Sequence, residues 1–339
     1  MNLEERIRAM VALGQKLQKK DEYLDAVMQR TQFNNGWFTL ENQQQAVGAI
    51  AKHFLEEAAL RRWLSRYDWQ EPLAPKTIGL VLAGNIPLVG FHDILCVFMA
   101  GHRALIKLSE KDQFLLPALL KFLEQIDPRT ADYFQLTNQL KDFDGVIATG
   151  SNNSSRYFEA YFGKYPNIIR RNRNAVAVLT GAETSGELMA LGKDIFTYFG
   201  LGCRNVSKIY VPKGYDFNAF LEAMHEYREV ILNTKYKNNF DYNYALLVLN
   251  REPYVANGCL ILTERPSLQS HIAGLHYEFY EKANELQEEL SNRASEIQCI
   301  VAREEAINLP VLPFGKAQEP ALWDYADGVD TLAFLLGLN

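Results

Sequence analysis

The arrangement of apolar residues from Thr77 onward limits the fold of this chain most strongly. Short apolar runs of strand length alternate there with longer stretches of helical periodicity. This alternation is typical of βαβ units around a mostly parallel sheet, so it predicts the α/β fold class. We expect strands at residues 77–83, 103–108, 145–149 and 175–179, and helices near 89–99, 113–124 and 154–162.

A second α/β unit is expected further along the chain. Its predicted strands are residues 207–211, 244–249 and 259–263, and its predicted helices are residues 217–230 and 277–294. No internal repeat, low-complexity tract or long linker separates the two units in the sequence. We therefore expect the units to pack closely together.

The N-terminal part has a different pattern. From Leu3 to Tyr67 most apolar residues recur at spacings of three and four, which predicts amphipathic helices. The Asn34–Gly36 run interrupts this pattern, and Thr39 is a suitable N-cap for a second long helix. The proline-flanked stretch Glu71–Pro75 is expected to end the helical region.

The composition excludes several classes of protein. The 339 residues carry a net charge of -6, so the chain lacks the general positive charge of a nucleic-acid-binding protein. The N-terminus has no apolar leader and no segment has the uninterrupted apolar length of a membrane span, so a cytoplasmic protein is expected. The widely spaced cysteines and histidines predict neither a metal site nor a disulfide framework: Cys96, Cys203, Cys259 and Cys299 are the cysteines.

The first candidate site follows the strand predicted at 77–83. Gly84 permits a tight turn, Asn85 offers an amide donor, and Pro87 suits the first turn of a helix. A donor at the end of a parallel strand is well placed to stabilise an oxyanion. The alternative interpretation is an ordinary Gly-Asn turn.

The second candidate site is Gly150-Ser151, which also follows a predicted strand and begins a helix. Backbone N–H groups at a helix N-terminus bind phosphate well. The GxGxxG fingerprint of dinucleotide-binding proteins is absent, so a simple capped helix start is the alternative.

The third candidate site is the glycine-rich loop around Cys203. Gly200 and Gly202 would give a substrate access to the backbone, and Arg204 is placed to stabilise a thiolate. Cys203 is therefore a candidate nucleophile, whereas Cys96 lies in an apolar helical run and is expected to be structural. A buried structural cysteine is also the alternative for Cys203.

Three arginines have two open interpretations. Arg170, Arg171 and Arg173 either form a solvated face or contact phosphates of a cofactor or of coenzyme A.

Four short motifs, in this chain order, resemble those of the aldehyde dehydrogenase superfamily. They are an Asn-x-Pro turn, a Lys-x-Ser-Glu strand end, a Gly-Ser helix start and a Gly-x-x-Cys loop: Asn85-Ile86-Pro87, Lys107-Leu108-Ser109-Glu110, Gly150-Ser151 and Gly200-Leu201-Gly202-Cys203. Within the superfamily, the chain is most similar to the acyl-CoA reductase (LuxC-type) family from about Trp37 onward. That closer similarity rests on Asn172–Leu179, Cys203–Pro212 and Phe314–Thr331.

The resemblance implies an aldehyde-dehydrogenase-like fold with two Rossmann-like, three-layer α/β domains and an N-terminal helical segment. The expected parts are the helical segment at residues 1–75, a cofactor-binding domain at 76–185, a catalytic domain at 186–310 and a C-terminal segment at 311–339 that packs back on the core.

The resemblance also implies roles for the candidate residues. Cys203 would attack an acyl-CoA thioester and hold the acyl group, with Asn85 and the Cys203 N–H as the oxyanion hole. A nicotinamide cofactor would then reduce this thioester to an aldehyde. NADPH is expected and NADH is the alternative, with cofactor contacts at Lys107, Ser109, Gly150 and Ser151.

One segment departs from the superfamily pattern. Where aldehyde dehydrogenases carry a Glu-Leu-Gly-Gly segment, this chain has Ile168–Arg173 without a glutamate. The base that hydrolyses the acyl-enzyme is therefore missing, which favours a thioester reductase. Glu183 and His92 are the candidates for the proton donor that releases the aldehyde.

A long-chain fatty acyl-CoA reductase is thus the leading hypothesis. The alternatives are a short-chain acylating aldehyde dehydrogenase, an acyl-phosphate reductase of the glutamyl phosphate type, and a redox-inactive acyl-carrying subunit. Expected partners are an acyl-CoA or acyl-protein donor, with an acyl-transferring protein and a second copy of the chain as further candidates.

Overall fold

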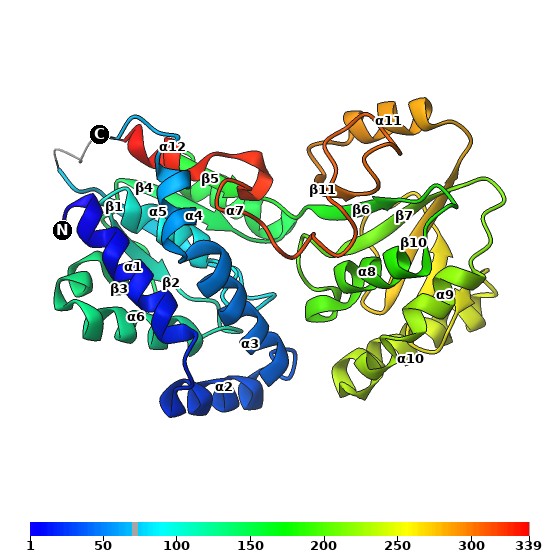
Figure 1. Cartoon of the computed structure of the whole chain (residues 1–339), viewed down its shortest axis with the longest axis horizontal. Helices are drawn as coiled ribbons and strands as arrows, with labels where there is room; N and C mark the ends of the chain where they lie inside the picture. Colours follow the sequence, from blue (N-terminus) through cyan, green and yellow to red (C-terminus); the bar gives the residue numbers. More distant parts are fainter. Residues whose placement is uncertain (70–73, 339) are drawn as a thin grey trace. The chain divides into compact units, whose positions relative to one another are not determined.

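The computed structural model describes residues 1–69 and 74–338, and the chain forms two compact units (Figure 1). The first unit comprises Met1–Asn172 and Pro320–Asn339, and the second comprises Arg173–Glu319. The chain therefore passes between the units twice, after Asn172 and after Glu319.

The N-terminal segment is helical, as predicted. Its helices are α1 (Leu3–Leu17), α2 (Glu22–Asn34), α3 (Leu40–Ala49) and α4 (Glu57–Leu64), with a π-helical turn at Ile50–Phe54. Thr39 is confirmed as an N-cap, because its side chain accepts the Asn42 N–H at 3.2 Å. Within the expected stop at Glu71–Pro75, residues 71–73 lie outside the described residues.

The described part of the first unit contains a five-stranded, all-parallel sheet in the order β3-β2-β1-β4-β5. Its strands are β1 (Thr77–Val81), β2 (Arg103–Lys107), β3 (Phe134–Leu136), β4 (Gly145–Thr149) and β5 (Asn167–Arg170). Its further helices are α5 (Phe91–Met99), α6 (Leu115–Ile126), α7 (Asn152–Phe162) and α12 (Thr331–Leu336). α5 is buried along its length, with α1 and α12 packed against it.

The described part of the second unit contains a six-stranded sheet in the order β11-β6-β7-β10-β9-β8, in which only β8 is antiparallel. Its strands are β6 (Asn174–Val178), β7 (Val206–Pro212), β8 (Val255–Ala256), β9 (Ile261–Glu264), β10 (Gly274–Tyr280) and β11 (Ile297–Val301). Its helices are α8 (Ser185–Phe196), α9 (Asn218–His225), α10 (Thr234–Asn250) and α11 (Ala283–Asn292). β6 is a nearly continuous apolar run because both faces of a parallel sheet are covered.

Two elements of the second unit differ from the prediction. Residues 244–249 were predicted as a strand but form the end of α10, which Asn233 caps through the Lys235 and Tyr236 N–H groups. Residues 277–294 were predicted as one helix but begin in β10, and α11 starts only at Ala283. Short apolar runs do not by themselves distinguish a strand from a helix.

The unit limits also differ from the expected ones at 185 and 310. β6 pairs with β7 and β11, so the second unit begins at Arg173. The C-terminal segment divides at Pro320, and its last part joins the first unit through α12. Within residues 1–69 and 74–338, every helix is too short or too polar to cross a lipid bilayer.

Candidate active site

Three of the sequence motifs lie at the carboxyl edge of the first sheet. β1 pairs in parallel with β2 on one side and with β4 on the other. The ends of these strands and the loops after them carry Asn85, Lys107–Ser109 and Gly150-Ser151. The strand order reverses at β1, and open α/β sheets bind ligands beside such a reversal. The structure therefore brings these predicted residues to one edge.

The loops after β1 and β2 touch at Gly84. A Cβ atom on Gly84 would lie 2.2 Å from Oγ of Ser109 and 2.6 Å from its Cβ, well below the 3.0 Å that real Cβ atoms keep. Glycine is therefore required here while Ser109 stays in place. This contact fixes the Asn85 loop against the predicted cofactor residue Ser109.

Replacing Gly84 with alanine is expected to lower the free energy of unfolding by about 1–3 kcal/mol, because the new methyl group overlaps Ser109. Urea denaturation measures this loss. The matched control is Gly48→Ala in α3, where an added Cβ meets nothing within 4 Å and a small gain in stability is expected. Equal stability of the two variants would contradict the close contact.

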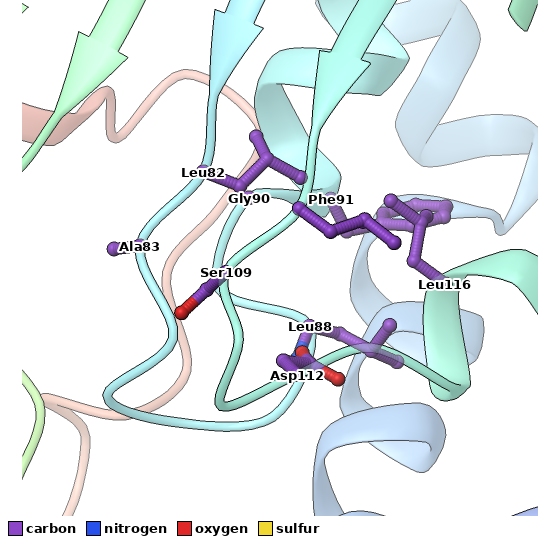
Figure 2. A pocket seen from close by; sticks show the side chains of 9 residues that line it. Leu82, Ala83, Leu88, Gly90, Phe91, Ser109, Asp112 and Leu116 are labelled. Atoms are coloured by element: carbon purple, nitrogen blue, oxygen red, sulfur yellow. The ribbon is translucent and has the colours of Figure 1, made fainter. Parts of the chain in front are cut away.

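A small pocket lies beside this contact (Figure 2). It is lined by Leu82, Ala83, Leu88, Gly90, Phe91, Leu108, Ser109, Asp112 and Leu116. Apart from Ser109 and Asp112, the lining side chains are apolar. Asp112 is thus a buried carboxyl group in a largely apolar setting.

Asp112 holds the far end of the Asn85 loop. Its Oδ2 accepts the Leu88 N–H at 2.8 Å, and Leu88 has a left-handed φ of 56°, which is uncommon for a side chain of this type. Oδ1 has no hydrogen-bond partner among the described residues. Burial raises the pKa of Asp112 to about 6, although the Leu88 N–H favours the charged form.

This raised pKa predicts a pH-dependent stability. The folded state favours the protonated carboxyl, so the stabilisation is complete below about pH 4 and is lost as the pH rises through about 6. Asp112→Asn removes the ionisation, so at pH 8 it should be more stable than the wild type by about 3 kcal/mol. At pH 4.5 the gain should be much smaller. Guanidinium denaturation at both pH values tests this, and an equal difference at both would show that Asp112 does not titrate as stated.

The Gly150-Ser151 motif begins α7. The Ser151 Oγ accepts the Ser154 N–H at 3.2 Å, so the capped helix start anticipated as an alternative is present. A Cβ on Gly150 would lie 2.9 Å from the Cβ of Ser154. The motif therefore places a helix N-terminus at the carboxyl edge of the sheet, and helix N-termini are suited to phosphate groups.

Cys203 lies in the second unit, in the loop between α8 and β7. It is partly exposed and belongs to no disulfide. Cys96, by contrast, is completely buried in α5, and burial raises the pKa of its thiol well above the ordinary value. The structural role predicted for Cys96 is confirmed, and the accessible thiol in a loop is Cys203.

The backbone before Cys203 is strained. Tyr198 and Phe199 have φ values of 54° and 58°, and Gly200 follows with 75°. A left-handed conformation costs an L-residue roughly 1–2 kcal/mol, and such strain is concentrated at functional sites.

Sequence reasoning missed Asn205 and Asp194, which hold this loop and the end of α8. The only sequence signal was an asparagine, a common turn residue, two positions after the cysteine.

The three arginines have different surroundings. Arg170 is 4% exposed and forms an ion pair with Asp93 at 2.5 Å, so the solvated-face interpretation is wrong for it and its guanidinium is already engaged. Arg171 is exposed and pairs with Glu159 at 2.5 Å. Arg173 donates to two backbone carbonyls, those of Ala294 and Ile297.

The two candidate proton donors have local partners. Glu183 accepts hydrogen bonds from Thr180 and Gly181 at the end of β6. His92 lies 2.9 Å from the Leu322 carbonyl oxygen through Nε2 and packs among the rings of Phe54, Trp63 and Tyr325. Both side chains thus have structural contacts.

In the described ranges, no three His, Cys, Asp or Glu side chains form a group that could hold a metal ion.

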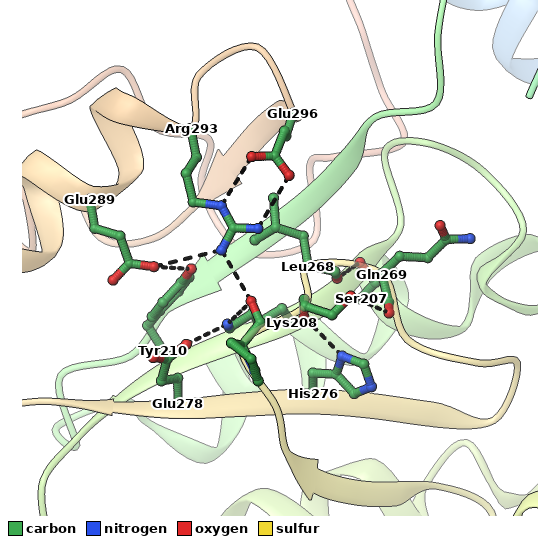
Figure 3. Close-up of polar contacts among 12 residues, drawn as sticks. Ser207, Lys208, Tyr210, Leu268, Gln269, His276, Glu278, Glu289, Arg293 and Glu296 are labelled. Carbon is green, nitrogen blue, oxygen red and sulfur yellow. Dashed lines mark hydrogen bonds and ion pairs between the residues drawn. The ribbon is translucent and has the colours of Figure 1, made fainter. Parts of the chain in front are cut away.

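A separate polar network crosses the second sheet (Figure 3). Lys208 on β7 is completely buried and donates to Glu278 at 2.5 Å and to the Pro266 carbonyl at 3.0 Å. Arg293 contacts Glu289 and Glu296, and Tyr210 donates to Glu289. This network joins β7, β10 and α11 and contains no predicted site residue.

Comparisons with known sequences identify a family to which most of the chain is similar. Residues 15–227, well over half of the chain, match the family described as acyl-CoA reductase (LuxC). A long-chain acyl-protein thioester reductase of Aliivibrio fischeri is 24% identical over 223 residues. That match covers 60% of this chain and 45% of the relative, so it spans less than half of the relative's length.

Solved structures share the fold. An NADP-dependent enzyme of E. coli superposes with a TM-score of 0.71 at 11% identity, covering 95% of this chain and 79% of that chain. A mutant indole-3-acetaldehyde dehydrogenase of P. syringae, solved with NAD+, gives a TM-score of 0.66 at 12% identity over 91% of this chain and 74% of that chain. The predicted aldehyde-dehydrogenase-like fold is confirmed.

Proposed function

We propose, because this chain belongs to the acyl-CoA reductase (LuxC) family, that it reduces an activated acyl group to an aldehyde through a thioester on Cys203. The observation that carries the proposal is the environment of this cysteine. Of the four cysteines, Cys203 is the one in a glycine-rich loop, where a strained backbone holds a partly exposed thiol. Such a setting suits a nucleophile.

The proposed reaction has two stages. The Cys203 thiolate attacks the carbonyl carbon of the donor thioester, the donor thiolate leaves, and the acyl group remains on Sγ. The Asn85 amide and the Cys203 N–H are the proposed donors to the oxyanion. Reduction of this thioester and loss of the thiolate then give the aldehyde and restore Cys203. Asn85 belongs to the first unit and Cys203 to the second. Kinetic measurements must therefore test whether the two residues act in the same step of the reaction.

A nicotinamide cofactor would supply the hydride. The carboxyl edge of the first sheet suits a dinucleotide, because the strand order reverses there at β1 and Gly150 precedes a helix N-terminus. Lys107 and Ser109 are the proposed ribose contacts, and Gly150 and Ser151 the proposed pyrophosphate contacts. We favour NADPH because the positive charge of Lys107 suits a 2′-phosphate; solved relatives include an NADP-dependent enzyme and one with NAD+.

The surroundings of Arg170 support a reductase over a hydrolytic dehydrogenase. Arg170 lies in the stretch that corresponds to the Glu-Leu-Gly-Gly segment of aldehyde dehydrogenases. The stretch Ile168–Arg173 contains no Asp or Glu, and its Arg170 is buried in an ion pair with Asp93, so this stretch offers no carboxylate to activate water against the acyl-enzyme. The acyl group is thereby left for reduction.

We propose a long-chain acyl-CoA or an acyl-protein as the donor, the second because the Aliivibrio fischeri relative is an acyl-protein thioester reductase. An acyl-transferring protein and a second copy of the chain are the proposed protein partners. The test is aldehyde formation from acyl-CoA esters of two to sixteen carbons and from an acylated protein, with NADPH and with NADH. The proposal expects the highest kcat/KM with long acyl chains and NADPH. Preference for two-carbon esters, or for an acyl phosphate, would overturn the long-chain assignment.

A further inference from the structure

Asn205 follows Cys203 by two residues and is almost completely buried, with 2% of its surface exposed. Its carboxamide bonds in two directions. Oδ1 accepts the Gly202 N–H at 2.8 Å, and Nδ2 donates to the carbonyl oxygens of Asp194 at 3.0 Å and Thr197 at 2.8 Å. One side chain thus connects the residue before Cys203 with the end of α8.

The backbone closes the same turn. The Asn205 N–H donates to the Gly202 carbonyl at 3.0 Å, so Gly202 and Asn205 are joined by one backbone bond and one side-chain bond. Cys203 lies inside this four-residue turn. The backbone conformation at Cys203 is therefore constrained by two hydrogen bonds that both involve Asn205.

The Asn205 side chain also spans the strained segment. Thr197 precedes the left-handed residues Tyr198 and Phe199, and Gly202 follows them, so the carboxamide holds both ends of the turn. The accepting carbonyls lie at the C-terminus of α8, where helical partners are missing. The strained backbone therefore persists because Asn205 bridges it.

The same helix end holds a second segment. The Asp194 carboxylate accepts the N–H groups of Gly315 at 2.6 Å and Ala317 at 2.9 Å. Asp194 is completely buried, and its backbone carbonyl is one of those bonded to Asn205. The loop of Cys203 and the segment around Gly315 are thus anchored at one point of the second unit.

We propose that Asn205 is the positioning residue of Cys203: its carboxamide fixes the loop so that the thiol is presented in one orientation to the acyl carbonyl. This inference rests on the proposed role of Cys203 as the nucleophile. Asn205 does not take part in bond making. Its effect is to keep the nucleophile in an attacking geometry, where a displacement of about 1 Å can lower a rate ~100-fold.

The chemistry of the contacts requires a carboxamide. Position 205 must offer one acceptor to an N–H and donors to two carbonyl oxygens. Alanine offers none of these. A carboxylate retains the acceptor, but its second oxygen would face carbonyl oxygens and repel them. A protonated carboxyl offers one donor and restores part of the bridge.

The first test compares Asn205→Ala with a matched variant, Asn257→Ala. Asn257 also closes a loop of the second unit, accepting the Leu260 N–H at 3.0 Å and donating to the Leu221 carbonyl at 2.9 Å. Alkylation of Cys203 by iodoacetamide is followed by peptide mass spectrometry, together with kcat and the cofactor KM. Asn205→Ala is expected to lower the alkylation rate and kcat by roughly 10- to 100-fold with an unchanged KM, whereas Asn257→Ala leaves all three unchanged.

The second test uses Asn205→Asp, which keeps the shape of the side chain. Its alkylation rate relative to the wild type should be low at pH 8 and should recover as the pH falls and the carboxyl becomes protonated. A role in folding stability alone predicts that the folded fraction of Asn205→Asp is alkylated at the wild-type rate at every pH. The inference would be overturned if folded Asn205→Ala had the alkylation rate and kcat of the wild type. It would also be overturned if the alkylation rate of Asn205→Asp, divided by that of the wild type, did not change with pH.

The tests separate this inference from the proposed function. If wild-type Cys203 accepts no acyl group from any donor, the proposed function fails. The iodoacetamide comparison still reports whether Asn205 orients the thiol, because alkylation requires neither an acyl donor nor a cofactor.

Discussion

Replacing Cys203 with alanine is expected to abolish acyl-enzyme formation and to lower kcat for aldehyde production by more than about 10³-fold, because no other group can hold the acyl chain as a thioester. The fold should be retained, since the side chain is small, lies in a loop and belongs to no disulfide. The measurement is the mass of the intact protein after incubation with tetradecanoyl-CoA, before and after NADPH is added. The wild type should gain one acyl group and lose it as aldehyde when NADPH is supplied.

The matched control is Cys299→Ala. Cys299 lies on β11 and, like Cys203, is partly exposed, so it is the cysteine whose nonspecific acylation must be separated from catalysis. The Cys299→Ala variant should acquire and release the acyl group as the wild type does. An adduct of equal yield on Cys203→Ala would assign the acyl group to another residue and contradict the proposed nucleophile.

The core strands were predictable from the sequence because their environment is uniform. β1, β4 and β6 are buried on both faces and therefore appear as apolar runs of strand length. Residues 244–249 have the same appearance but extend α10, in which Leu249 is 77% exposed. An apolar run on an exposed helix breaks the usual relation between pattern and burial, so the sequence alone suggested the wrong element.

The candidate site was predictable to the extent that it depends on strand ends. Asn85, Ser109 and Gly150 follow neighbouring strands, and the parallel order places them at one edge. The partners of Arg170 could not be predicted, because Asp93 is 77 positions away in the sequence and Thr331 is 161 positions away. Local patterns contain no information about which distant carboxylate a buried guanidinium will meet.

Among the ion pairs of the first unit, truncation of Asp93 to alanine is expected to lower the free energy of unfolding most. Its side chain is 7% exposed and that of Arg170 is 5% exposed, with 2.5 Å between Oδ2 and Nη1. Asp93→Ala removes the carboxylate that is bonded to the buried Arg170 cation, and such a loss typically costs about 3–5 kcal/mol. The Thr331 hydroxyl also accepts from Nη2 but carries no charge. Urea denaturation monitored by tryptophan fluorescence measures the loss.

The neighbouring arginine provides the control. Arg171 pairs with Glu159 at the same 2.5 Å, but the two side chains are 63% and 48% exposed. Glu159→Ala should therefore lower the free energy of unfolding by less than about 1 kcal/mol, because water solvates the released cation. The double variant Asp93→Leu with Arg170→Met should recover most of the stability lost in Asp93→Ala, since it removes both buried charges. Equal losses for Asp93→Ala and Glu159→Ala would mean that the Arg170 cation reaches solvent when its partner is removed, and that burial does not set the strength of this pair.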